Sequence, residues 1–314
     1  MSSFGPVYVV GPRPGHLHTH TAVLLHGRGS TGEEFADELF GTALSDVRTP
    51  SLADCLPTWR WVFPSSPSAW SATFEEWMPA WFEAHSLADP AARQDLQQPG
   101  LEASAQHTRD MLDEERQRLQ SNTGLADVDT RLVLGGISLG GAVALWTLLG
   151  TDAPTRALGG FVAVSAWLPF AQQVHALLVG DRAGAHKSWP RDDTILEPMA
   201  FVSKAMASLS RFLLLRQKAS TAPATSVLAT PVFLGHGRDD AYVHVQLGRQ
   251  AYQLLTDAGF TSVEWQVYEG AEQEGHWLKE PEEMDDLARF LSTIAGSYQS
   301  VREDQNCECM RTDM

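Results

Sequence analysis

The segment LVLGGISLGGAVALW at residues 132–146 passes from strand-forming to helix-forming residues around a single serine. Its first residues are aliphatic, and its last are apolar and rich in alanine. Between them, residues 136–140 match the GxSxG pattern, which presents a serine hydroxyl on a tight turn between a strand and a helix. Glycines two residues either side of Ser138 allow the strand and the helix to approach closely. The segment therefore predicts a βα unit that exposes Ser138 at the end of a sheet.

Short apolar runs recur along the chain and alternate with segments of helical periodicity. Most of the runs are continuously hydrophobic, which is typical of strands buried on both faces of a parallel sheet. The runs lie at 21–27, 59–64, 130–136, 160–167, 230–237 and 263–270, and the clearest helical patterns at 101–120, 139–150, 244–258 and 281–295. This alternation predicts an α/β protein with a mostly parallel, doubly wound sheet and helices on both faces.

The composition is that of a globular protein with a large core. The chain has 314 residues, 43% of them hydrophobic, so we expect a single domain over 1–314. No run of about 18 uncharged apolar residues occurs, which argues against stable membrane insertion. The first residues do not form a signal-peptide pattern, and we expect a cytoplasmic protein. The net charge of -16 opposes binding to nucleic acid and favours small molecules or proteins as partners.

The three cysteines do not form a recognisable framework. Cys55 is isolated, while Cys307 and Cys309 lie close together in a polar C-terminal segment. This spacing fits neither a set of disulfides nor a zinc site. We expect a disordered tail at 300–314 with incidental thiols, with lipidation or redox use as the alternatives.

Two aspartates and a histidine follow Ser138 in an order that suits nucleophilic catalysis. A serine hydroxyl needs a histidine to take its proton and a carboxylate to orient that histidine. FLGHGRDDAYV places Asp239 and Asp240 just after an expected strand, and YEGAEQEGHW places His276 just before the last expected helix. Serine, acid and histidine is the order found with GxSxG. The residues alone do not choose between the aspartates, and a solvated turn or an exposed loop histidine remains the alternative.

Two backbone N–H groups are candidates for stabilising an oxyanion beside Ser138. That of Leu139 lies at the positive end of the helix that follows the serine. That of Arg28 lies in LLHGRGS, a glycine-rich turn after the first strong strand. Such a turn can also bind phosphate, but HGRGS matches neither GxGxxG nor GxxxxGK[ST]. Oxyanion binding is therefore the stronger interpretation.

One segment, 171–229, interrupts the alternation because it contains no good strand. It has apolar residues at a 4-3-4-3-4 spacing, which predicts one helix at about 195–215 with a single apolar face. The residues are Ile195, Met199, Val202, Met206, Leu209 and Leu213. We expect this helical insertion to act as a lid over the site, with packing on the body or a dimer contact as the alternatives.

Several motifs together resemble the acyl-protein thioesterase and carboxylesterase family of the α/β-hydrolase superfamily. They are LLHGRGS, FPSSP, WMPAWFE, LVLGGISLGGAVALW, VAVSAWLPF, PVFLGHGRDDAYV and VYEGAEQEGHW, in the order found in the family. The resemblance implies an α/β-hydrolase fold and an enzyme that cleaves esters or thioesters of acyl groups without a metal or an organic cofactor. It also leaves a homodimer open. A hydrolase of natural-product or polyketide esters, a serine peptidase and a noncatalytic binding protein of the same fold are the competing interpretations.

The resemblance also implies roles for individual residues. Ser138 would be the nucleophile, Asp240 the acid and His276 the base, with an oxyanion hole at Arg28 and Leu139. It places a largely aromatic set around the acyl pocket, for which core packing is the alternative. The set comprises Trp70, Trp77, Trp81, Phe82, Trp167, Leu168 and Phe170. Two features depart from the family pattern, because Leu139 stands where glutamine is common and the insertion at 171–229 is unusually long.

Overall fold

The computed structural model describes residues 3–46, 48, 51–71, 74–86, 89–179, 196–218 and 226–309. Within this part of the chain, seven strands form one sheet in the order β1-β3-β2-β6-β7-β8-β9. The strands are β1 (Val7–Val10), β2 (His20–Leu25), β3 (Trp59–Pro64), β6 (Leu132–Ile137), β7 (Gly160–Val164), β8 (Val232–Gly237) and β9 (Val263–Tyr268). Strand β1 is antiparallel to β3, and the other six are mutually parallel. The predicted mostly parallel sheet is confirmed.

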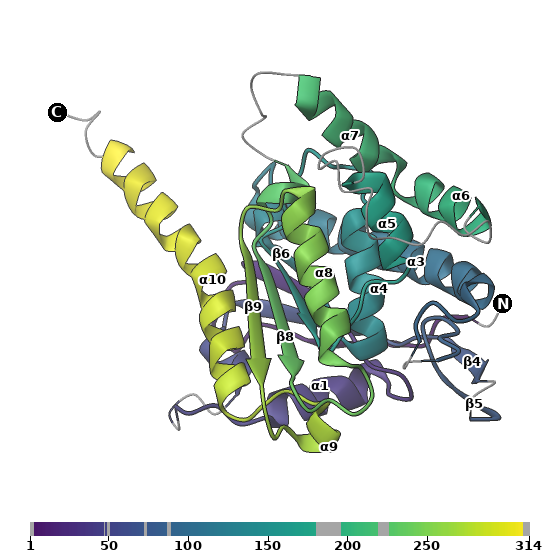
Figure 1. Cartoon of the computed structure of the whole chain (residues 1–314). Coiled ribbons are helices and arrows are strands. Elements are labelled where there is room, and N and C mark those ends of the chain that lie inside the picture. Colours follow the sequence, from purple (N-terminus) through teal and green to yellow (C-terminus); the bar gives the residue numbers. More distant parts are fainter. Residues whose placement is uncertain are drawn as a thin grey trace.

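Helices cover both faces of this sheet (Figure 1). The main helices are α1 (Gly32–Gly41), α3 (Gln94–Thr123), α4 (Ser138–Leu149), α8 (Val245–Ala258) and α10 (Glu282–Cys309). Short helices lie at α2 (Leu52–Cys55), η1 (Asp129–Arg131), η3 (Val227–Ala229) and α9 (Glu272–Gly275). The four helices predicted from periodicity correspond to α3, α4, α8 and α10.

The core lies in two layers because side chains alternate between the faces of each strand. Val23 and Leu25 of β2 belong to the cluster packed under α3, α4 and α8. Ala22 and Leu24 of the same strand belong to the cluster packed under α1 and α10. All six residues of β2 are buried, which explains why the strand has a continuous apolar pattern.

The described part of the insertion is helical but differs from the single helix expected at 195–215. Besides α5 (Ala171–Leu178), it contains α6 (Leu196–Ala205) and α7 (Ala207–Lys218), which meet at Met206 with a bend of 68°. The apolar face is real, because Val202, Met206, Leu209 and Leu213 are all buried. Ile195 lies outside the described residues. No glycine or proline marks the bend, so the periodicity alone did not reveal it.

The insertion packs on the body of the protein. Phe201 of α6 stacks on Trp146 of α4 with 5.3 Å between ring centroids, and Lys204 pairs with Glu102 of α3 at 2.8 Å. Helices α6 and α7 lie at the opposite end of the molecule from α9 (Figure 1). The packing alternative therefore describes these two helices better than the predicted lid does.

The C-terminal segment is described only in part, and the disordered tail expected over 300–314 stays a prediction. Helix α10 continues to Cys309, and 310–314 lie outside the described residues. The first turns of α10 pack on the sheet through Leu287 and Phe290. This packing stabilises the start of the helix. In the described part of the chain, no individual helix has the length and hydrophobicity to cross a membrane. Helices α6 and α7 taken together, although bent, are long and apolar enough when length and composition alone are considered.

Candidate active site

Ser138 lies at the junction of β6 and α4, at the carboxyl end of the central strands. Its backbone has φ of +54°, a left-handed conformation that is strained for a residue with a side chain. The flanking glycines are required by space, because a Cβ at Gly140 would lie 2.2 Å from the carbonyl oxygen of Leu25. A Cβ at Gly136 would lie 2.6 Å from the same oxygen. The close approach of β2 thus explains why glycines surround the serine.

His276 and Asp240 form a hydrogen-bonded pair. The Nδ1 of His276 lies 2.8 Å from Oδ2 of Asp240, and the carboxylate is buried. The other oxygen, Oδ1, accepts the backbone N–H groups of Tyr242 at 2.9 Å and Val243 at 2.8 Å. Because Nδ1 is engaged by the carboxylate, Nε2 is the ring nitrogen left to exchange a proton with a substrate or a hydroxyl.

Ser138 and His276 line the same cavity, which has a volume of about 490 Å³. The structure therefore brings the predicted nucleophile and base to one site, and Asp240 supports the base from behind. Asp239 has a different task, because its carboxylate accepts the backbone N–H of Gly270 at 3.0 Å. Residue types alone did not choose between the two neighbouring aspartates, and the resemblance selected Asp240; their hydrogen-bond partners distinguish them in the structure.

The charge on Asp240 is stabilised by its hydrogen bonds. Burial by itself acts to raise the pKa of this carboxyl, but the hydrogen bonds from His236 and His276 and from the N–H of Val243 outweigh burial. They hold the pKa of Asp240 well below its usual range. The carboxylate therefore remains ionised throughout the neutral range and can stabilise a positive charge on His276.

The loop predicted to supply an oxyanion donor lies beside Ser138 and lines the same cavity. Gly27 and Arg28 line the cavity, and a Cβ at Gly27 would lie 3.6 Å from the Cβ of Ser138. The guanidinium of Arg28 donates to the carbonyl oxygen of Ala84 at 2.7 Å. Leu139 is buried in the first turn of α4, where free backbone N–H groups are found. Both predicted donors therefore belong to segments that adjoin the serine.

A buried histidine fixes the shape of this loop. Nδ1 of His26 donates to the carbonyl oxygen of Gly27 at 2.6 Å, and its Nε2 accepts the N–H of Ser66 at 3.0 Å. Trp81 donates through Nε1 to the carbonyl oxygen of His26 at 2.9 Å. Burial lowers the pKa of His26 to about 4, so the ring is neutral near pH 7. Sequence reasoning identified the glycines of this loop but missed the role of His26.

The wall of the cavity differs from the predicted acyl pocket. Five of the predicted residues are buried in the hydrophobic core and do not line the cavity beside Ser138; these are Trp81, Phe82, Trp167, Leu168 and Phe170. These residues follow strands that end near the site, so the prediction assigned them to the pocket. Apolar side chains at such positions can also pack into the core, as these five do.

A two-stranded hairpin supplies part of the wall instead. It consists of β4 (Ser68–Ser71) and β5 (Glu76–Pro79). Trp70 and Trp77 pair edge to face across it and are 47% and 68% exposed, outside the cavity lining. Phe74 and Met78 of this region line the cavity, together with Tyr242, which follows Asp240 in the chain. Sequence analysis missed these three, although Tyr242 adjoins the predicted acid.

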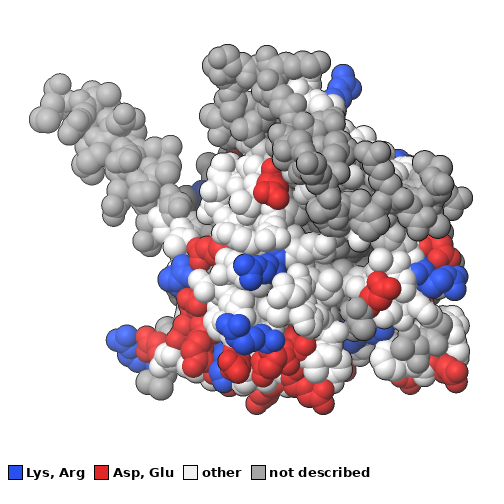
Figure 2. Space-filling view, viewed as in Figure 1, with Lys and Arg blue, Asp and Glu red and all other residues white. Residues whose placement is uncertain are grey.

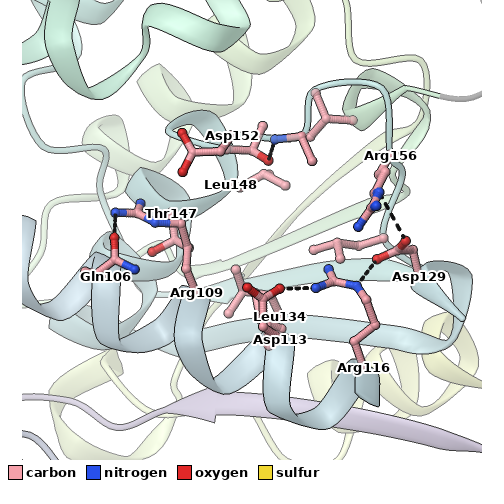
Figure 3. Close-up of a pocket in the computed structure, with 15 residues that line it drawn as sticks. Gln106, Arg109, Asp113, Arg116, Asp129, Leu134, Thr147, Leu148, Asp152 and Arg156 are labelled. Carbon is pink, nitrogen blue, oxygen red and sulfur yellow. Dashed lines mark hydrogen bonds and ion pairs between the residues drawn. The ribbon is translucent and has the colours of Figure 1, made fainter. Parts of the chain in front are cut away.

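A second cavity, of about 310 Å³, lies between α3 and the end of α4 (Figure 3). Its charged groups are largely paired with one another, since Arg116 binds both Asp113 and Asp129, the latter at 2.7 Å. Neither Ser138 nor His276 lines it. The arrangement is that of a structural ion-pair network that ties α3 to the start of β6, and it contains no serine and histidine pair.

Comparison with known proteins identifies the family of the chain. A family model described as phospholipase/carboxylesterase matches residues 10–206 and 202–295, which is most of the chain.

The chain belongs to the phospholipase/carboxylesterase family.

Relatives of this family member include two fungal proteins named acyl-protein thioesterase 1. The one from Gibberella zeae is 26% identical over 87% of this chain and 90% of the relative. The one from Candida albicans is 25% identical over 90% of this chain and 95% of the relative. A crystal structure of Zea mays acyl-protein thioesterase 2 matches with a TM-score of 0.58 and 25% identity, covering 92% of this chain and 99% of that one. The predicted family, fold and ester-hydrolase class are confirmed.

Proposed function

We propose that this phospholipase/carboxylesterase family member hydrolyses acyl esters and thioesters through an acyl-Ser138 intermediate. The observation that carries the proposal is the His276–Asp240 pair, which borders the cavity that Ser138 also lines. A serine and a histidine in one cavity, with a buried carboxylate on the far nitrogen of the imidazole, are the parts that acyl transfer requires.

The reaction begins when Nε2 of His276 takes the proton of the Ser138 hydroxyl and Oγ attacks the acyl carbonyl carbon. The backbone N–H groups of Arg28 and Leu139 stabilise the negative oxygen that forms. When the carbon–oxygen or carbon–sulfur bond breaks, His276 returns its proton to the departing alcohol or thiol. Water then repeats the sequence on the acyl-serine, which releases the carboxylic acid and restores the serine hydroxyl.

Acyl-protein thioesters are the substrates that we propose, with small acyl esters as surrogates. The relatives named acyl-protein thioesterase 1 and the size of the cavity support this choice. We further propose cytoplasmic action. The negative surface in Figure 2 supports partners other than nucleic acid, because acidic side chains gather toward the end where Figure 1 places α1 and α9.

The test is hydrolysis of p-nitrophenyl esters and acyl-thioesters whose chains run from acetyl to palmitoyl. Ser138→Ala is the blank, and a fluorophosphonate probe reports the nucleophile. We expect labelling at Ser138 and no turnover or labelling in the variant. Undiminished hydrolysis by Ser138→Ala would remove the mechanism.

A further inference from the structure

A second histidine, His236, contacts the acid Asp240. Its Nε2 lies 3.4 Å from Oδ2 of Asp240, the same oxygen that binds Nδ1 of His276 at 2.8 Å. His236 is at the end of β8 and is buried with 1% of its surface exposed. The carboxylate of Asp240 is thus approached by two imidazole rings, of which only His276 reaches the cavity of Ser138.

The hydrogen bonds of His236 define which nitrogen carries its proton. Nε2 lies 2.8 Å from the carbonyl oxygen of Val243, and a carbonyl can only accept, so Nε2 is the donor. Nδ1 has no hydrogen-bond partner within the described parts of the chain. The single N–H of the ring therefore points at the Val243 carbonyl with the Asp240 carboxylate beside it.

The ring of His236 has little room to move. A Cβ on Gly248 of α8 would lie only 2.4 Å from Nδ1, so α8 closes one side of the ring. Trp265 of β9 lies on another side, with 6.0 Å between ring centroids. Its backbone is held by the pairing of β8 with β9, where His236 is opposite Val267. The donor is therefore held in place by strand pairing and by packing.

His236 and Asp240 together fix the turn that carries the acid. The N–H of Val243 donates to Oδ1 of Asp240 at 2.8 Å, while the carbonyl of Val243 accepts from His236 at 2.8 Å. Both backbone groups of Val243, its N–H and its carbonyl, are therefore hydrogen-bonded, and these two bonds hold the turn. Because Oδ1 is held by backbone N–H groups, the direction of Oδ2 toward His276 depends on how firmly this turn is held.

We propose that His236 is a positioning residue that holds Asp240 in line with His276 through Val243 and through contact with Oδ2. The inference rests on the proposed function, because it assigns Asp240 as the acid. His236 does not reach the substrate cavity, so it acts on turnover through Asp240 and leaves substrate binding unchanged.

Two amide substitutions of His236 distinguish the effect of its hydrogen bond to Val243 from the effect of losing the imidazole ring. In His236→Gln the side-chain amide nitrogen falls close to the place of Nε2 and can still donate to Val243, whereas in His236→Asn it is too short to reach. We expect the asparagine variant to lose roughly 10- to 100-fold in kcat with KM within about twofold, as is typical of a small displacement in catalytic geometry. The glutamine variant should recover most of kcat. His244→Gln, at the exposed cap of α8, is the matched control and should behave as the parent.

Spectroscopy and labelling complete the test. The proton on Nδ1 of His276 gives a far-downfield NMR signal when it is bound to a carboxylate, and we expect this signal to broaden or shift in His236→Asn and to persist in His236→Gln. Fluorophosphonate labelling of Ser138 should slow in proportion to kcat.

The outcomes distinguish this inference from the proposed function. If Ser138→Ala is inactive but a folded His236→Asn keeps its kcat and its downfield signal, only the positioning role is wrong. If His236→Asn does not fold, the glutamine variant decides: a folded His236→Gln with turnover as low as that of Asp240→Asn overturns the role. If Ser138→Ala remains active, the proposed function itself fails.

Discussion

The carbonyl oxygen of Gly275 lies against Gly237 so closely that a Cβ on Gly237 would come within 1.9 Å of it. Gly237 ends β8 three residues before Asp240, and Gly275 immediately precedes His276. The segments that carry Asp240 and His276 therefore pack backbone to backbone. We expect this contact to hold Asp240 and His276 at their hydrogen-bonding distance.

Gly237→Ala should separate these loops, because the new methyl group meets backbone rather than a movable side chain. We expect kcat to fall roughly 10- to 100-fold, since a displacement of about 1 Å costs that much in catalytic geometry. Steady-state kinetics on a p-nitrophenyl ester measure the loss. Gly41→Ala, where an added Cβ meets nothing within 4 Å, is the control. Equal activity in both variants would show that the loop contact does not set the geometry.

The two aspartates should differ sharply in their effect on turnover. Asp240→Asn leaves His276 with the wrong tautomer, so kcat should fall by roughly 10³ to 10⁴. Asp239→Asn removes only acceptors for the N–H of Gly270 and should cost about tenfold or less. Circular dichroism verifies that each variant is folded. A larger loss at Asp239 would overturn the assignment of the acid.

Phe74 should influence the preference for acyl chain length. It lines the cavity beside Ser138, with the Arg28 guanidinium 5.9 Å from its ring centroid. Phe74→Ala removes apolar surface from the wall, so KM for long acyl esters should rise roughly three- to tenfold while the acetate ester is unaffected. Trp77→Ala, on the same hairpin but outside the cavity lining, should leave the preference unchanged. Identical profiles for the two variants would exclude Phe74 from the acyl site.

The stability of the protein should depend on pH through Glu283 of α10. Burial raises the pKa of Glu283 to about 8 from its ordinary 4.5; nearby Asp286 adds to this and the N–H of Lys279 opposes it. An acid whose pKa is raised on folding stabilises the native state fully below pH 4.5, and this stability is lost as the pH rises toward 8. Glu283→Gln keeps an acceptor for Lys279 and should gain stability on the order of a few kcal/mol near pH 8.

Urea unfolding from pH 5 to pH 9 checks this, and the exposed neighbour provides the control. Glu282→Gln should follow the pH dependence of the parent protein, whereas the profile of Glu283→Gln should be flatter. Parallel profiles for the parent and Glu283→Gln would mean that the buried carboxyl does not titrate in this range.

The sequence by itself determined the sheet and the candidate nucleophile. The apolar runs became strands of the sheet, and β2, β6, β7 and β8 are buried along their whole length because their alternate side chains meet two layers of helices. Strand β1 escaped notice because it is a short, half-exposed edge strand. The glycines around Ser138 indicated that backbones approach closely there, because only a residue without a side chain fits such a contact. Residue type alone is enough to predict this local feature.

Only the tertiary structure decided which side chains meet. It gave Asp240 and Asp239 different partners, which residue types alone did not distinguish, because the direction of a loop carboxylate depends on the segments packed around it. It also placed α6 and α7 against the body, since an apolar helical face does not say which apolar surface it covers. Likewise, only the fold showed that Phe74, Met78 and Tyr242 are among the residues that line the cavity. Periodicity and motif spacing encode burial and local turns, whereas contacts between distant segments depend on how the whole chain packs.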